Sequence, residues 1–223
     1  GPAGKVVAVE PNPDMAAILR QALNRNHANT VVVAECALGD EAGEVELRVA
    51  PRNVGASRLA IRGVTSSEQE FGSLLSSLTT VSLAHDTFGK AEESHDVGNE
   101  QLLHSVEMRT LDDLVAEHGL PKLVKIDIEG AEYLCLKGAK KLLSGGFGPQ
   151  PIISMEYSNL FPTFGGKRED AFNLLIEQGY AAYRMRAGKV HGGDFLEVSD
   201  PDKAPDHDDL FFIPATKMED VAR

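Results

Sequence analysis

The sequence lacks three features that would each point to a particular class of protein. It contains no run of about 18 apolar residues, so we expect no membrane span in this chain. Its two cysteines, Cys36 and Cys135, lack metal-binding spacing, which argues against a disulfide scaffold or zinc site and favours a reducing, cytoplasmic location. Positive charge is also scarce: 22 Lys and Arg residues against 34 Asp and Glu residues leave a net charge of −12, which argues against a nucleic-acid partner.

The overall composition is that of a soluble globular domain. Hydrophobic residues make up 42% of the 223 residues and charged residues 25%. A chain of this length can bury one core, so we predict a single domain over residues 1–223. Residues 51–105 break the regular pattern because they are rich in Ser, Thr, Gly and Glu, and we interpret them as an insert within that domain.

Hydrophobic patterns predict strands that alternate with helices. Apolar runs typical of buried strands occur in "VVAV", "VVVA", "LVKI" and "PIISM". Helix signals occur in "NPDMAAILRQALNRN", "TLDDLVAEH", "AEYLCLKGAKKLL" and "REDAFNLLIEQGY". Asn12 is the predicted N-cap of the first helix, and Thr110 with Asp113 resembles a capping box at the start of the second. The alternating segment "GEVELRVA" is typical of an antiparallel edge strand, and "DDLFFIP" is the last predicted strand. This order predicts an α/β fold, with a mostly parallel sheet and helices on both faces.

Acidic residues stand where several of these strands end. Glu10 ends the first strand, Asp127 and Glu129 follow a middle strand, and Glu156 lies near the end of the next one. Ligands of such sheets bind at the carboxyl ends of the strands, so these residues outline a candidate site. Glu10 itself has two interpretations: it could bind the hydroxyls of a ribose, or it could be an anion favoured by the dipole of the helix that follows.

The middle carboxylates also have more than one interpretation. Asp127 could orient a substrate hydroxyl or take its proton, or it could accept hydrogen bonds from the backbone of the turn at Gly130. Glu132 is more simply explained as an anion favoured at a helix N-terminus. Asp127, Glu129 and Glu156 could together hold Mg²⁺, but we predict no metal site. The seven histidines fall in predicted loops or at helix ends and form no predicted site.

The segment "VKIDIEGAEYLCLKGA" resembles the signature of the FkbM-type methyltransferases. Other segments match in the family's order, namely "GKVVAVEPNP", "ECALGD", "GEVELRV", "NVGASRL", "EMRTLDDLV" and "PIISMEYS", so the resemblance covers most of residues 4–158. It implies a Rossmann-like class I methyltransferase sheet whose last strand is antiparallel. It also implies S-adenosylmethionine as the cofactor, and O-methylation of a hydroxyl on a small molecule or glycan as the reaction.

The resemblance further implies roles for individual residues. Glu10 would bind the ribose hydroxyls, and Asp127 would lie by the transferred methyl group, as a base or as the group that orients the hydroxyl. The implied cofactor-binding residues are Glu10, Pro11, Asn12, Ala37, Leu38 and Asp127, of which Ala37 and Leu38 would line the adenine pocket. The implied catalytic residues are Asp127, Glu129 and Glu156, of which the last two would shape the acceptor side.

One departure from the family pattern leaves alternatives open. Family members begin with a strand and a glycine-rich turn that holds the methionine part of the cofactor, and these 223 residues contain no such turn. We therefore expect an N-terminally incomplete sheet, with weak or no cofactor binding by this chain alone. The alternative is a non-catalytic Rossmann-like binding domain that has lost its donor site. A nicotinamide-dependent oxidoreductase is disfavoured because no GxGxxG motif occurs.

Overall fold

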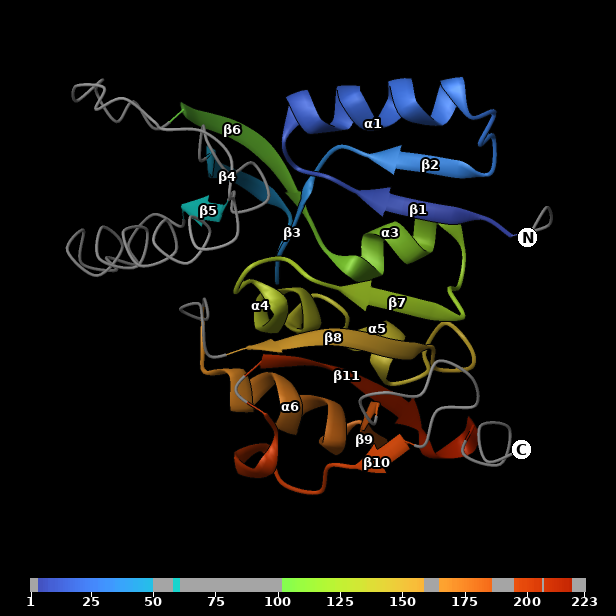
Figure 1. The fold of residues 1–223 in the computed structure, drawn as a ribbon, viewed down its shortest axis with the longest axis vertical. Helices are drawn as coiled ribbons and strands as arrows, with labels where there is room; N and C mark the ends of the chain where they lie inside the picture. Colours follow the sequence, from blue (N-terminus) through green and yellow to red (C-terminus); the bar gives the residue numbers. More distant parts are fainter. Residues whose placement is uncertain are drawn as a thin grey trace, which may run out of the picture.

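The computed structural model describes residues 4–49, 58–60, 102–158, 165–185, 195–205 and 207–217, which form a mixed α/β fold (Figure 1). The strands are β1 (Val6–Val9), β2 (Val31–Ala34), β3 (Ala37–Leu38), β4 (Gly43–Val49), β5 (Arg58–Ala60), β6 (Leu102–Arg109), β7 (Leu123–Ile126), β8 (Ile152–Ser158), β9 (Tyr180–Met185), β10 (Phe195–Glu197) and β11 (His207–Pro214). The helices are α1 (Pro13–Arg25), α3 (Leu111–His118), α4 (Glu132–Lys137), α5 (Lys140–Leu143) and α6 (Arg168–Glu177), with 3-10 turns η2 (Pro201–Lys203) and η3 (Ala215–Lys217).

Hydrogen bonding divides the strands into three sheets. β1 and β2 form a parallel pair, and five strands form a second sheet in the order β10-β9-β11-β8-β7. In that sheet β7 and β8 are parallel, whereas β11 runs antiparallel to both β8 and β9, as predicted for the last strand. The prediction of one mostly parallel sheet is not met within the described residues, because β1 and β7 each pair with a neighbour on one side only.

The third sheet has the order β3-β6-β4-β5 and includes part of the predicted insert. β5 and the first residues of β6 fall inside residues 51–105, so this region contributes strand residues, while most of it lies outside the described residues. The prediction that "GEVELRVA" forms an edge strand is wrong. β4 is antiparallel as expected, but it pairs with β6 on one side and β5 on the other.

The core lies on one face of the five-stranded sheet. Alternate residues of β8 point to it, namely Ile153, Met155 and Tyr157, whereas Ser154, Glu156 and Ser158 point to the opposite face. Helices α3, α4, α5 and α6 contribute buried side chains to the same cluster. Its largest members include Phe172 of α6, whose ring packs edge-to-face on Tyr157 and Phe212. The strand pleat therefore directs Glu156 away from the core.

Side-chain caps start the helices where the sequence predicts. Asn12 caps α1, with Pro13 as the first helical residue, and Thr110 forms a capping box with Asp113 at the start of α3. No helix among the described residues has the length and apolar composition needed to cross a bilayer.

The helix predicted after the "IDIEGAE" motif is broken into α4 and α5. Gly138 lies at the break and packs against the backbone of Gly39: a Cβ on Gly138 would lie 2.1 Å from the Gly39 carbonyl oxygen. The carboxylate of Asp112 accepts hydrogen bonds from the backbone N–H groups of Lys141 (2.8 Å) and Leu142 (2.9 Å), so α3 provides the cap for α5. A tertiary contact, which helical periodicity does not reveal, thus ends α4.

Candidate active site

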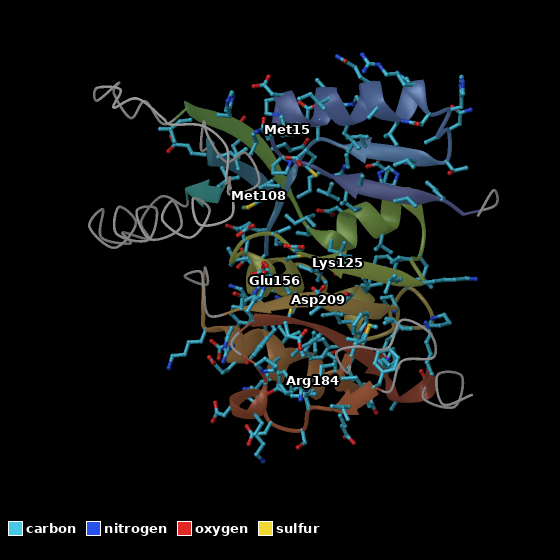
Figure 2. The ribbon with its side chains drawn as sticks, in the orientation of Figure 1. Met15, Met108, Lys125, Glu156, Arg184 and Asp209 are labelled. Carbon is cyan, nitrogen blue, oxygen red and sulfur yellow. The ribbon has the colours of Figure 1, made fainter. Side chains whose placement is uncertain are left out.

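Three carboxylates lie in register at one end of the five-stranded sheet. Ile126 of β7 pairs with Met155 of β8, which brings Asp127 beside Glu156 at the next position. Glu156 in turn pairs with Asp209 of β11. Figure 2 labels Glu156 and Asp209, which come from adjacent strands near the middle of the molecule. The predicted proximity of Asp127 and Glu156 is therefore present, and Asp209 extends the row.

Lys125 neutralises the two outer members of this row. Its Nζ lies 2.5 Å from Asp209 Oδ1 and 3.5 Å from Asp127 Oδ2 (Figure 2 labels Lys125 and Asp209). Burial alone would lower the pKa of Lys125, but the hydrogen bond to Asp209 and the charges of Asp209 and Asp127 raise it overall. Lys125 is therefore a fixed cation of the site.

Glu156 differs from the other two carboxylates because it is largely buried, with 14% of its side chain exposed. Burial, followed by the negative charges of Asp127 and Glu129, raises the pKa of Glu156 to about 7. A hydrogen bond with Asp127 acts in the same direction. Both the carboxylic acid and the carboxylate are therefore populated near neutral pH, which suits a group that exchanges protons with a ligand.

The turn after β7 explains why the motif contains so many acidic residues. Glu132 Oε1 accepts hydrogen bonds from the backbone N–H groups of Ile128 (3.0 Å) and Gly130 (3.2 Å). These bonds hold a turn in which Glu129 and Gly130 have φ values of 55° and 101°, a region that residues other than glycine seldom adopt. Glu132 therefore stabilises the turn. It accepts the backbone hydrogen bonds that one interpretation of the sequence assigned to Asp127.

At the end of β1, Glu10 is tied to the start of α1. Its Oε1 accepts a hydrogen bond from the backbone N–H of Asn12 at 2.8 Å, and Asn12 Oδ1 accepts one from the N–H of Asp14 at 3.0 Å. Asn12 is 2% exposed and Glu10 is half-buried. The side chain of Glu10 is therefore oriented by the same backbone turn that begins the helix.

A small cavity of about 20 Å³ lies beside Glu156. Its lining includes Gly130, Glu132, Ser158 and Arg168. A cavity of this size has room for about one water molecule, and the charged groups in its lining offer hydrogen-bond partners.

The sequence model of the methyltransferase FkbM domain matches residues 1–185 of this chain. The chain belongs to the FkbM methyltransferase family. A solved structure that also matches is the crystal structure of methyltransferase FkbM from Methylobacillus flagellatus KT, at 18% sequence identity and a TM-score of 0.47. The alignment covers 94% of this chain and 36% of the other, so the chain spans little more than a third of that protein's length. A search of curated proteins finds no match.

In this FkbM domain the two residues predicted to line an adenine pocket lie in β3. Ala37 is 2% exposed and packs in a small core cluster with Val45 and Leu47, whereas Leu38 is half-buried. Asp40, which follows shortly after, forms an ion pair with Lys137 at 2.8 Å, and this hydrogen bond lowers the pKa of Asp40. Leu38 is thus the more accessible of the two predicted pocket residues.

Sequence reasoning missed two residues of the candidate site. The prediction that every histidine lies in a loop or at a helix end is wrong for His104, which lies in β6, and for His207. His207 begins β11 and lies 3.2 Å from Glu156. Asp209 follows two residues later on the same face. The alternation in "HDDLFF" was the available signal, but it has meaning only once β11 is known to pair with β8.

The FkbM domain contains potential metal ligands and two cysteine thiols. Among the described residues, no three His, Cys, Asp or Glu side chains are grouped so that they could hold a metal ion. Cys36 and Cys135 are free and buried. Burial raises the pKa of the Cys135 thiol to about 12, so this residue is a small core side chain and not a nucleophile.

Proposed function

We propose that this FkbM domain serves S-adenosylmethionine-dependent methyl transfer to a hydroxyl oxygen of a small molecule or glycan. The family match over residues 1–185 carries the proposal. Figure 1 adds support, because β1, β7 and β8 all point to the same side of the view. Glu10 and Asp127 directly follow β1 and β7, and Glu156 lies near the end of β8. The bound cofactor supplies an electrophilic methyl group, so the protein's tasks are to bind, to orient and to handle a proton.

We assign the ribose of the cofactor to Glu10. The hydrogen bond from Asn12 uses one oxygen of Glu10, and a carboxylate has capacity for several more. Pro11 and the buried Asn12 hold this carboxylate in place through the start of α1. Ala37 and Leu38 are assigned to the adenine side, where Leu38 offers the accessible apolar surface.

We assign the acceptor side to Asp127, Glu129 and Glu156. A hydroxyl is a weak acid, so a nearby carboxylate that can accept its proton assists the reaction. Glu156 is the group suited to that task, because burial and its acidic neighbours raise its pKa to about 7. Asp127 lies between Lys125 and Glu156 and would orient the hydroxyl, while Glu129 strengthens the local negative potential.

The donor side is expected to need one more strand. Among the described residues, β1 and β7 each pair with a neighbour on one side only, which supports the proposal that a further strand with a glycine-rich turn pairs with them. We therefore expect titration calorimetry to show weak or no binding of S-adenosylmethionine to these 223 residues alone. Micromolar binding would contradict the need for this strand and leave the assignment of Glu10 intact.

The decisive experiment compares two acidic residues that each follow a parallel strand. In a full-length protein, Glu10→Ala should weaken S-adenosylmethionine binding roughly tenfold to hundredfold, because charged hydrogen bonds to the ribose are lost. Glu35→Ala is the matched control: Glu35 follows β2 but is exposed and pairs with Arg20 at 2.5 Å. Equal affinities for both variants would exclude the ribose role of Glu10.

A methyl-transfer assay with a labelled donor and a panel of hydroxyl acceptors then tests the reaction itself. Transfer to a hydroxyl that is lost in Glu10→Ala supports the proposal. The non-catalytic alternative predicts a different result: no transfer to any acceptor, together with a bound partner whose affinity does not change in Glu10→Ala.

A further inference from the structure

His207 and Glu156 form a pair between neighbouring strands. His207 begins β11 and pairs in register with Ser158 of β8. Its Nδ1 lies 3.2 Å from Glu156 Oε1 and 3.2 Å from Ser158 Oγ. The His207 side chain is 57% exposed, whereas that of Glu156 is 14% exposed. The imidazole therefore connects a largely buried carboxyl group with solvent.

Most of the charge around Glu156 is negative. Asp127 at the end of β7, Glu129 in the following turn and Glu132 of α4 all act on it and disfavour its ionised form. Asp209 of β11 is its cross-strand neighbour. A proton taken up by Glu156 is therefore stabilised by the surroundings, and its release needs an acceptor close by.

The nearby cations are already engaged. Lys125 of β7 pairs with Asp209 and Asp127. Arg168 of α6 stacks over the Tyr157 ring at 4.4 Å and pairs with Glu169 at 3.1 Å. His207 directly contacts Glu156, and histidine is the side chain that ordinarily exchanges protons near neutral pH.

We propose that His207 is a positioning residue that orients Glu156 as proton acceptor for the substrate hydroxyl and then passes the proton to water. The inference rests on the proposed function, because the hydroxyl proton must leave as its oxygen is methylated. The O–H bond breaks, its electron pair stays on the oxygen and the proton joins a carboxylate oxygen of Glu156. Imidazole Nδ1, which carries no proton in the Nε2–H tautomer, then takes this proton, and the exposed ring releases its Nε2 proton to solvent. The charge of the pair is thereby restored, and proton exchange with water returns the ring to the Nε2–H tautomer for the next turnover.

The first test measures the coupling of the two groups without any cofactor. Histidine ring signals are followed by NMR between about pH 5 and 9, and His207→Asn identifies the signal of His207. We expect the ring signals of His207 to change in Glu156→Gln, because Nδ1, 3.2 Å from Glu156 Oε1, then faces an amide in place of a carboxylate. His118, which lies 3.5 Å from Glu117, is the internal control and should not move. Unchanged His207 ring signals would overturn the proposal.

The converse variant keeps the test informative if Glu156→Gln does not fold. In His207→Ala, the side-chain carboxyl signal of Glu156 should titrate at higher pH than in the unchanged protein, because a group that stabilises the carboxylate is lost. A Glu156 midpoint that stays the same would likewise contradict the pairing.

The pH profile of methyl transfer in the full-length protein separates orientation from proton transfer. His207→Asn retains a hydrogen-bonding group near the position of Nδ1 but does not titrate in this range. We expect kcat to fall in both His207→Ala and His207→Asn with little change in the acceptor KM, and the Asn variant to recover part of the loss. Unchanged kcat and pH profile in both variants would refute the proposal. Coupled titration without any methyl transfer would instead refute the proposed function.

Discussion

The β1–α1–β2 unit and the five-stranded sheet are stabilised in different ways. From the start of β1 to the end of β2, only Asn12 and Ala16 are buried. Val6, Ile18 and Val32 remain 53%, 56% and 38% exposed. The five-stranded sheet, by contrast, packs on a cluster of large side chains that α6 completes. The proposed ribose end of the site therefore depends on backbone pairing and helix caps, whereas the proposed acceptor end stands on a packed core.

The largest effect is expected for a substitution in the packed core of the five-stranded sheet. Phe172 is 1% exposed and contacts the rings of Tyr157 and Phe212, so Phe172→Ala should lower the free energy of unfolding by about 3–5 kcal/mol. Ile18→Ala, in the 56% exposed position of α1, should change it by less than about 1 kcal/mol. Urea denaturation measures both. Similar losses for the two variants would show that the regions do not differ as described.

A smaller effect is expected where α4 meets the turn after β3. Gly138→Ala places a methyl group 2.1 Å from the Gly39 carbonyl oxygen and should destabilise the fold by about 1–3 kcal/mol. Gly43→Ala is the matched control, since nothing lies within 4 Å of the added methyl group. If Gly138→Ala is as stable as Gly43→Ala, then packing between Gly138 and Gly39 does not break the helix.

The pH dependence of stability tests the raised pKa of Glu156 at the proposed acceptor end. The folded pKa of Glu156, about 7, exceeds the ordinary value of 4.5, so the folded state binds this proton more tightly than the unfolded state does. Its contribution to stability is therefore full below about pH 4.5 and is lost as the pH rises through 7. Glu156→Gln should stabilise the chain by about 1–2 kcal/mol near pH 8, after allowance for solvent screening, and have little effect near pH 4. Equal stability at both pH values would contradict the raised pKa.

The smallest effect concerns the lightly packed unit. Asn12→Ala removes the side-chain cap of α1 and should cost about 1 kcal/mol. Asn24→Ala, an exposed position within the same helix, should be neutral or slightly stabilising because alanine is the better helix former. Thermal unfolding followed by circular dichroism compares them, and a larger loss at Asn24 would show that the cap does not hold the helix.

Much of the fold was predictable because its signals are local. The N-cap at Asn12 and the capping box of Thr110 with Asp113 depend on residues a few positions apart, and both are confirmed. The break at Gly138 and the central place of β4 depend on partners distant in sequence, and both predictions failed there. Helical and strand periodicity describe a segment's own conformation and not its neighbours.

The candidate site likewise has features that the sequence determines and features that only the tertiary structure determines. The order of acidic residues, and the motif that places the chain in the FkbM family, are properties of the sequence by itself. Only the tertiary structure decided that Glu132 holds a turn, that Glu156 is buried among like charges, and that His207 reaches it from β11. The physical reason is that burial and charge depend on which side chains surround a residue. For Glu156 those side chains come from the end of β7 and the turn after it, from α4 and from β11, which only the folded chain brings together.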